Sequence, residues 1–365
     1  MAANLNIDLD TFDSAQFQWK PALRRVPAIV LLLAAGVCLK QPAAAVLAAG
    51  TALSVGFGAS RQFLGSRLLA MVMTTLSMSV AAFAGTIIGN VYFGTLLATA
   101  ISGYVFASLT FVGEDLGWIA MQGVIALLIG TSFASTVQDG LIRSGFIFIG
   151  GVVQILFISL IWRLEGIGQF GGESDAAKVC AERGPALNQM GKMFLSATAF
   201  SWVAFRYGMR VAVTLVLAVE IDHLLRLQNG YWLPMTTLIV LKPDFYQTYT
   251  GGVRRVVGTL GGVVFASIIA LVLRPHDAIL ISLAGSLAFI TYASQKANAV
   301  LFSAALTSFV VFMIAVTGLP ETSVTWHRLI NTALGCVLAF ASYSLGFFFL
   351  HRLPPPAGKV AGQAH

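Results

Sequence analysis

A series of apolar stretches without charged residues constrains this chain more than any other feature of its sequence. Eleven such stretches follow one another between residues 26 and 350, and the one at residues 68–113 also contains the turn-forming pair Gly89 and Asn90. Apolar runs of about 18 residues or more are typical of membrane-spanning helices. Because residues 68–113 are long enough for two helices, the pattern predicts about twelve transmembrane helices.

The composition agrees with this interpretation. Of the 365 residues, 57% are hydrophobic and only 10% are charged, whereas soluble globular domains average about 25% charged residues. A large soluble domain is therefore excluded. Backbone polar groups in lipid must be satisfied within each segment, and the sequence has no alternating barrel pattern. We expect an all-α polytopic membrane protein.

The apolar stretches form an internal repeat. Shifting the first half by about 187 positions superposes six stretches on six, aligns Arg67 with Arg254 and brings Arg143 near Arg328. Because six is even, both halves have the same orientation, which predicts parallel six-helix repeats. We expect residues 1–25 to be a cytoplasmic segment, 26–163 and 201–351 the two repeats, 164–200 a polar cytoplasmic linker and 352–365 a cytoplasmic tail.

The distribution of basic residues predicts the orientation. With the N-terminus in the cytoplasm, 17 of the 22 lysines and arginines lie inside, and five lie outside: Lys40, Arg143, Arg226, Arg274 and Arg328. Cytoplasmic loops carry such an excess, so both termini are expected in the cytoplasm. The net charge of +7 is then explained by contact with anionic lipid, and nucleic acid is not an expected partner.

The stretch that ends at Lys242 is too short to cross a membrane. From Tyr231 to Lys242 it has 12 residues, which cover about 18 Å of a hydrocarbon core roughly 30 Å thick. Short or Gly/Pro-interrupted helices at matching places in two repeats indicate a transporter's binding site, and the matching stretch at residues 43–56 is also short. We therefore expect the substrate path to pass Lys242, Pro243 and Asp244. The alternative is a helix that continues past Pro243, with Lys242 reaching the cytoplasmic surface.

Arginines follow this stretch. Arg254 and Arg255 are expected at the cytoplasmic start of the next helix, and Arg67 holds the matching place in the first half. Guanidinium groups at the mouth of a cavity attract anions and bind a carboxylate with two hydrogen bonds, so an anionic substrate is expected. The alternative is an ordinary basic flank that fixes topology. Gly258 and Gly262 predict a close helix contact.

Two carboxylates lie in an apolar helix. Glu220 and Asp222 stand near the outer end of the seventh predicted span, and ionisable groups in such a place are candidates for proton coupling. An ordinary ion pair between Asp222 and Arg226, four residues further on, is an equal alternative.

The sequence contains none of the common catalytic motifs. The sequence has no HExxH, GxSxG or Walker A motif, and its three cysteines are far apart, so neither an enzyme nor a metal or cofactor site is expected.

The run YWLPMTTLIVLKPDFYQTYTGGVRRVVGTLGGVVFA resembles the signature of the fusaric acid resistance protein family, bacterial inner-membrane transporters also called aromatic acid exporters. In that family a Tyr-Trp pair opens a short helix that ends in a Lys-Pro or Gln-Pro turn, and an Arg and a Gly-Thr pair follow. The matching residues here are Tyr231, Trp232, Lys242, Pro243, Arg255, Gly258 and Thr259. A weaker similarity extends to plant aluminium-activated malate channels, in which the residue matching Arg255 would line an anion path.

The resemblance implies a bacterial inner-membrane protein that exports aromatic or other weak carboxylic acids, often with a periplasmic adaptor protein. We expect Arg67, Lys242, Arg254 and Arg255 to hold the carboxylate, and Tyr231 and Trp232 to present aromatic surface to the rest of the ligand. The rival hypotheses are a passive anion channel, which needs no coupling carboxyl group, and a non-transporting scaffold of an envelope complex.

Overall fold

The structure, a computed structural model, describes residues 12–166, 202–273, 276–318 and 321–350. In these ranges the regular elements are helical, with one isolated bridge between Phe63 and Ser66. A short 3-10 helix at Ser14–Gln16 precedes twelve α-helices: α1 (Trp19–Cys38), α2 (Pro42–Gly58), α3 (Arg67–Ile88), α4 (Tyr92–Val112), α5 (Glu114–Ser132), α6 (Val137–Leu164), α9 (Trp202–Leu225), α10 (Trp232–Val240), α11 (Phe245–Leu273), α12 (Asp277–Ser294), α13 (Ala299–Ala315) and α14 (Glu321–Leu350). The predicted all-α fold with twelve helices is confirmed.

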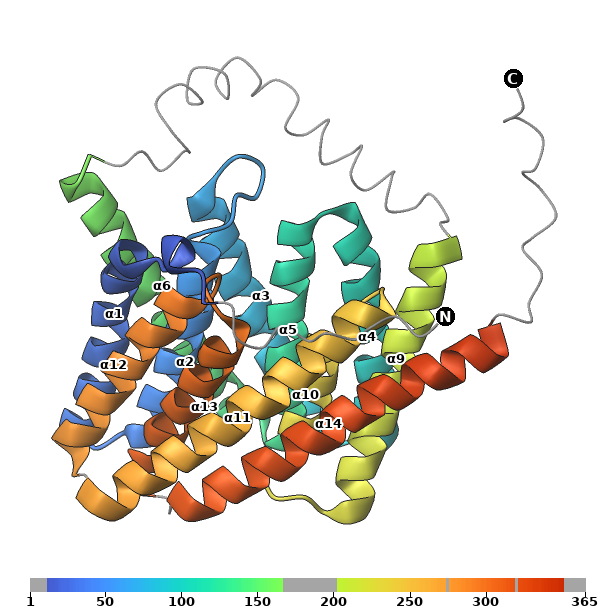
Figure 1. Ribbon diagram of the computed structural model, residues 1–365. Coiled ribbons are helices and arrows are strands. Elements are labelled where there is room, and N and C mark those ends of the chain that lie inside the picture. The colour runs from blue at the N-terminus through green and yellow to red at the C-terminus, as the bar shows by residue number, and fades with distance from the viewer. Residues whose placement is uncertain (1–11, 167–201, 274–275, 319–320, 351–365) are drawn as a thin grey trace, which may run out of the picture.

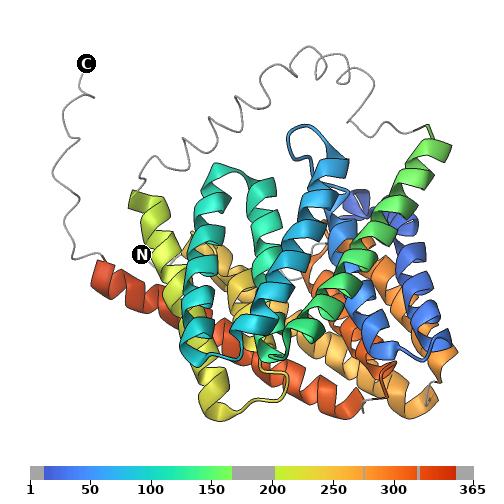
Figure 2. The same ribbon diagram turned by 180° about the vertical axis from the view of Figure 1, so that it is seen from behind.

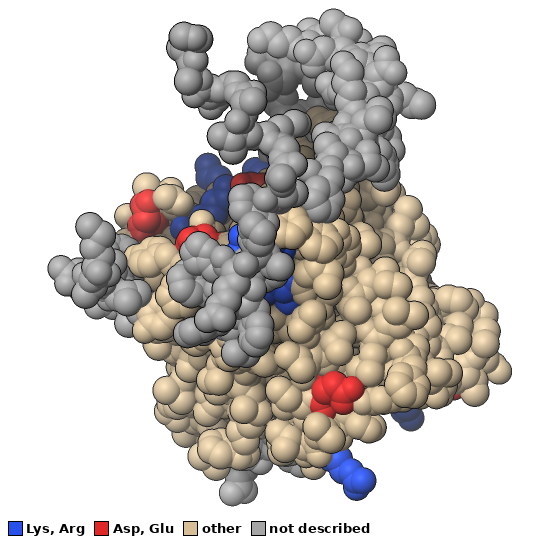
Figure 3. All heavy atoms as spheres, turned by 90° about the vertical axis from the view of Figure 1, so that its right-hand side faces the viewer, with Lys and Arg blue, Asp and Glu red and all other residues tan. Residues whose placement is uncertain are grey.

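Eight of these helices are long and apolar enough to cross a membrane, judged by length and composition. α2 and α13 have 17 residues each and are slightly shorter. Large apolar side chains such as Leu97, Ile268 and Leu271 are more than half exposed, and a surface of this kind suits contact with lipid. Figure 3 shows one face of the molecule, on which charged side chains gather towards the two ends and leave much of the surface without charge.

The expected break in residues 68–113 is present. α3 ends at Ile88 and α4 begins at Tyr92. Between them the side-chain amide of Asn90 donates to the carbonyl oxygens of Ile87 (3.2 Å) and Ser135 (2.8 Å). These hydrogen bonds satisfy carbonyl groups that the helix end leaves free.

α10 is as short as its sequence predicts. It has nine residues and ends at Val240, because Pro243 disfavours helical geometry in the residue before it. The backbone N–H of Lys242 donates to the Thr248 hydroxyl (2.9 Å), which donates in turn to the Asp244 carbonyl oxygen (2.9 Å). The alternative of a helix that continues past Pro243 is therefore wrong.

The helices form one bundle, which α11 and α14 cross obliquely on the side seen in Figure 1, with α3 and α6 on the side seen in Figure 2. α3 packs on α5 and α6, and α11 packs on α13 and α14 in the same way. Between the halves, α4 packs on α9 and α1 packs on α12. The two predicted halves therefore pack against each other through these two pairs of helices.

Glycines allow the closest of these contacts. A Cβ atom at Gly258 would lie 2.5 Å from the carbonyl oxygen of Val300, and one at Gly262 would collide with the Ala304 carbonyl. The Ser308 hydroxyl donates to the carbonyl oxygen of Gly262 (2.9 Å). The predicted close contact at Gly258 and Gly262 is thus confirmed, and it joins α11 to α13.

Helix ends differ from the predicted boundaries at several places. α1 begins at Trp19, inside the segment 1–25, and α11 begins at Phe245, ten residues before Arg255. The predicted linker at 164–200 lies outside the described residues after Gly166, as does the tail at 352–365.

Candidate functional site

The short helix α10 is held in place by α14. A Cβ atom at Gly335 would lie 2.8 Å from the carbonyl oxygen of Leu233, so the two helices approach closely. Thr237 donates a hydrogen bond to the Gly335 carbonyl oxygen (3.2 Å). The Asn331 amide donates to the carbonyl oxygens of Gln228 (3.1 Å) and Asn229 (3.3 Å), in the loop before α10. α14 is therefore fixed against both α10 and its preceding loop.

This packing buries Arg328, one of the five basic residues expected on the outer side. Arg328 lies two turns inside α14 and is only 3% exposed. Its guanidinium carbon is 5.0 Å from the centre of the Trp232 ring, and Trp232 is 2% exposed. The Arg328 Nε has no hydrogen-bond acceptor in the described part of the chain. α14 begins at Glu321, eight residues before the apolar stretch, so Arg328 lies inside this helix and not beyond its end, as the apolar stretch alone predicts.

Arg255 is the second buried arginine of this region. It is 6% exposed, and its Nε also lacks an acceptor within the described ranges. Cys336 of α14 lies beside it and donates a weak Sγ–H hydrogen bond to the carbonyl oxygen of Gly252, one turn earlier on α11 (3.7 Å). The positive charge of Arg255 is within electrostatic reach of Arg328. The expectation that Arg255 marks the cytoplasmic start of its helix is wrong, because Arg255 lies inside α11.

Neither Arg255 nor Arg328 has a carboxylate partner among the residues that the structure describes. The salt bridges between described residues join Arg24 to Glu165 and Arg61 to Asp115. Burial of an unpaired charge in a membrane protein costs about 3 kcal/mol or more, and two like charges also repel each other. Arg255 and Arg328, which we call the buried arginine pair, therefore form a site with a strong electrostatic preference for an anion.

The backbone N–H groups at the start of α10 are poorly placed to donate hydrogen bonds to such an anion. The N–H groups of Trp232 and Leu233 already donate to the carbonyl oxygens of Asn229 (3.1 Å) and Gly230 (2.9 Å). Pro234 has no N–H group. Recognition of an anion at this place would therefore depend on the guanidinium groups rather than on the helix terminus.

The corresponding place in the first half is different. Arg143, which the 187-residue shift brings near Arg328, donates to the Thr86 hydroxyl (2.7 Å) and to the Phe133 carbonyl oxygen (2.6 Å). Leu68 stands where the shift places Arg255. The buried arginine pair is thus a feature of the second half.

Tyr231 and Trp232 differ in what they can contact. Trp232 is enclosed, with Arg328 over its ring. Tyr231 is partly exposed, and its ring centre lies 5.5 Å from that of Trp232 and 5.7 Å from that of Phe133. Trp232 can therefore orient Arg328, whereas Tyr231 can offer aromatic surface to a ligand.

Lys242 lies beyond the opposite end of α10. It is partly buried, and burial first and the charge of Arg61 second lower the pKa of its ammonium group. Arg61 lies 4.7 Å from the centre of the Trp118 ring and 3.4 Å from the Asp115 carboxylate. This end of α10 therefore carries a second cationic group, formed by Lys242 and Arg61.

Arg67 belongs to another neighbourhood. It is the first residue of α3, and its charge acts on Arg25 of α1, which is 5% exposed and lies 5.4 Å from the Tyr292 ring centre. Arg254 is partly exposed on α11 next to Arg255. The structure thus brings Tyr231, Trp232 and Arg255 together with Arg328, while Lys242 and Arg67 contact other groups.

Glu220 and Asp222 lie near the C-terminal end of α9. The Tyr92 hydroxyl of α4 donates to Glu220 (2.5 Å). The Asp222 carboxylate rests against Gly230, where a Cβ atom would collide with it. Arg226 follows the helix end with a φ of +48°, and it forms no salt bridge with Asp222. The alternative of an ordinary Asp222–Arg226 ion pair is therefore wrong.

The helices, their lipid-suited surface and the buried arginine pair define the class: an all-α polytopic membrane protein with a cationic site inside its bundle. Residues 197–342 match the sequence model of the fusaric acid resistance protein-like family. The resemblance is therefore confirmed for this part of the chain, which contains the buried arginine pair.

Several relatives are similar over shorter regions. An uncharacterized protein of Haemophilus influenzae is 24% identical over 190 residues, which is 51% of this chain and 26% of the relative. Uncharacterized protein ORF2 of Neisseria gonorrhoeae is 29% identical over 144 residues, 38% of this chain and 33% of the relative. Inner membrane protein YccS of Escherichia coli is 27% identical over 142 residues, 38% of this chain and 19% of the relative. The chain thus spans a third or less of these relatives' length, and no solved structure matches it significantly.

Proposed function

We propose that this protein transports organic anions and that Arg255 and Arg328 bind the carboxylate of the substrate. The observation that carries the proposal is the burial of both guanidinium groups without an acidic partner in the described ranges. An anion between α10, α11 and α14 would offset the cost of these charges, and a guanidinium group can hold a carboxylate by two parallel hydrogen bonds.

The substrate class is aromatic or other weak carboxylic acids. Tyr231 supports this choice because it is a partly exposed residue whose ring centre lies 5.7 Å from that of Phe133 and which is within electrostatic reach of Arg328. Trp232 contributes indirectly, by fixing the guanidinium of Arg328 over its ring. The similarity of residues 197–342 to a fusaric acid resistance family supports the same class.

Lys242, with Arg61, forms the mouth of the path in this proposal. Their positive charges attract the anion before it reaches the buried arginine pair. Arg254 and Arg67 add positive charge elsewhere in the bundle and complete the proposed set of carboxylate-attracting residues.

Proton coupling through Glu220 and Asp222 is a further part of the proposal. Asp222 touches Gly230, the residue directly before Tyr231. Protonation of this carboxylate would change the charge at the loop that leads into α10. The absence of a salt bridge from Asp222 to the described lysines and arginines leaves it able to exchange a proton.

The cellular setting follows from the relatives and from the basic residues. We place the protein in the bacterial inner membrane with both termini in the cytoplasm, and we assign it export, with a periplasmic adaptor as a partner. The inner-membrane name of the E. coli relative supports this location. The matching packing of α1–α6 and α9–α14 supports two parallel repeats.

The flux of radiolabelled benzoate from proteoliposomes tests the proposal. Arg255→Gln and Arg328→Gln should each lower flux at least tenfold, because each leaves a single buried guanidinium for the carboxylate. Arg226→Gln is the matched control, since Arg226 is exposed and follows the end of α9. Wild-type flux no greater than that of protein-free vesicles would contradict transport of this acid and favour the scaffold.

A passive channel is the second candidate, because the buried arginine pair alone is enough for anion passage. Glu220→Gln with Asp222→Asn separates the two mechanisms under an imposed pH gradient. An exporter should lose the dependence of flux on the gradient and keep downhill exchange. Unchanged behaviour of this variant would favour the channel.

A further inference from the structure

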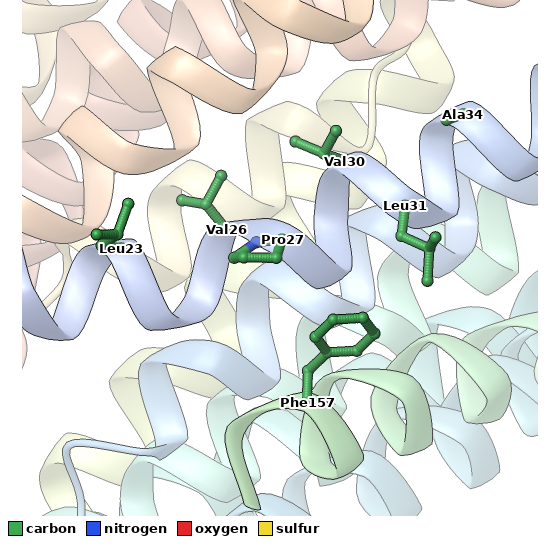
Figure 4. Close-up of a pocket in the computed structure, with 7 residues that line it drawn as sticks. All are labelled: Leu23, Val26, Pro27, Val30, Leu31, Ala34 and Phe157. Carbon is green, nitrogen blue, oxygen red and sulfur yellow. The ribbon is translucent and has the colours of Figure 1, made fainter. Parts of the chain in front are cut away.

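An apolar groove lies on the surface of the bundle between α1 and α6. It has a volume of about 530 Å³ and is lined along α1 from Leu23 to Ala34, with Phe157 of α6 as its other wall (Figure 4). Its lining side chains are apolar, and Leu23 and Leu31 are 59% and 49% exposed. The groove therefore offers no hydrogen bond to a carboxylate, but it suits a hydrocarbon chain.

One end of this groove is charged. Trp19 and Lys20 precede Leu23 by one turn on the same face of α1; both are exposed, and the Lys20 Nζ lies 5.4 Å from the Trp19 ring centre. Arg24 forms a salt bridge of 2.6 Å with Glu165, which follows the last residue of α6. This salt bridge ties together the two helices that wall the groove, at the end where Lys20 lies.

The chemistry changes sharply along the groove. Exposed tryptophan and lysine side chains at the end of a spanning helix are typical of the membrane interface, and basic residues there attract anionic lipid. Arg163 in the last turn of α6 adds another exposed cation, and Glu165, the salt-bridge partner of Arg24, is a carboxylate at the same end. An occupant with an anionic head and an apolar tail matches both parts of the groove.

We propose that this groove binds one anionic phospholipid, with an acyl chain between α1 and α6 and the phosphate at Lys20 and Arg24. In this arrangement the phosphate competes with Glu165 for Arg24. The site is separate from the anion-transport site, because its ligand enters from the lipid and contacts neither Arg255 nor Arg328.

Native mass spectrometry of the purified full chain tests this proposal, with phosphatidylglycerol and phosphatidylcholine of identical acyl chains as probes. Wild-type protein should retain phosphatidylglycerol several-fold more than phosphatidylcholine. Lys20→Gln and Arg24→Gln should reduce this preference towards one. Ala34→Phe, which fills the groove, should reduce retention of both lipids.

Glu165→Gln distinguishes lipid binding from a purely structural salt bridge. If the phosphate competes with Glu165, this variant should retain more phosphatidylglycerol than wild type; if the salt bridge only shapes the groove, it should behave like Arg24→Gln. Leu97→Phe on the exposed face of α4 and Arg226→Gln are matched controls that should leave retention unchanged. Equal retention of both lipids by wild type, or a second copy of the chain bound in place of lipid, would overturn the proposal.

Discussion

The guanidinium carbon of Arg328 lies 5.0 Å from the centre of the Trp232 ring, and both side chains are almost fully buried. Attraction between the cation and the ring offsets part of the cost of burying Arg328, but it does not neutralise the charge. Arg328 therefore has a defined position, and its positive charge has no anionic partner in the described part of the chain.

Replacement of Arg328 should leave the empty protein as stable as wild type or make it more stable. Removing an unpaired buried charge relieves a penalty, and Arg328→Met keeps most of the apolar stem. Arg143→Met should instead lower the midpoint of thermal unfolding, because it removes two charge-assisted hydrogen bonds worth about 1.5–3 kcal/mol each to Thr86 and Phe133. Thermal unfolding in detergent without added anion checks both. Destabilisation by Arg328→Met equal to that by Arg143→Met would mean that Arg328 has a structural role.

A carboxylate ligand should stabilise the folded protein. Binding to the native state alone adds about 2.7 kcal/mol at a ligand concentration 100 times the Kd. Titration with benzoate should therefore raise the unfolding midpoint of wild type, and the rise should disappear in Arg255→Gln. Arg226→Gln should respond like wild type. The same rise with an uncharged benzamide would argue against recognition of the carboxylate.

Adjacent glycines on α11 should differ in their tolerance of a larger side chain. Gly262 meets the Ala304 carbonyl and Thr307, whereas no atom lies within 4 Å of a Cβ at Gly261. Gly262→Leu should separate α11 from α13 and cost at least about 1–3 kcal/mol, while Gly261→Leu should be neutral. The yield of monodisperse protein and its unfolding midpoint measure the difference. Equal effects of the two substitutions would contradict the close α11–α13 contact.

Lys242 should make anion flux sensitive to alkaline pH. Burial and the charge of Arg61 lower its pKa below the ordinary value of 10.5, so Lys242 loses its charge at a lower pH than a free lysine. Flux should decline as pH rises through this lowered pKa. Lys242→Arg should keep its flux there, since arginine stays charged.

The lowered pKa of Lys242 also leads to a prediction about the stability of the protein. Between the lowered pKa and 10.5 the unfolded chain binds more protons than the folded one. The contribution of Lys242 to the free energy of unfolding should therefore increase as pH rises through this window. A pH profile of unfolding that is identical in wild type and Lys242→Met would show that the pKa of Lys242 is unshifted.

The number and order of the helices could be predicted from sequence because long charge-free stretches have few stable forms in lipid. The turn at Gly89 and the early end of α10 before Pro243 have local causes that are visible in the sequence. The continuation of α11 and α14 through charged residues has no such local signal. Arg255 and Arg328 lie inside these helices and are enclosed by neighbouring ones, and only tertiary packing shows this enclosure.

Only one member of the buried arginine pair could therefore be predicted from the sequence. The motif indicates Arg255, whereas Arg328 falls outside the predicted span because the apolar stretch starts at Leu329. Pro320, the last helix-breaking residue before it, is the sequence signal that could have extended the helix to include Arg328. The position of Arg67 near Arg25 rather than near Arg255 depends on how the halves pack, which residue spacing does not determine.

The length of α10 has an electrical consequence. Nine residues cover about 13 Å, less than half of a hydrocarbon layer roughly 30 Å thick. If polar groups and water occupy the space beyond its two ends, most of the membrane voltage falls across this short insulating segment. The electrostatic free energy of a monovalent anion that crosses there changes by about 2.3 kcal/mol per 100 mV of membrane potential. This change occurs over a distance shorter than the thickness of the bilayer. The movement of the anion along α10 should therefore depend on the membrane voltage, with the full change in energy concentrated within the length of this helix.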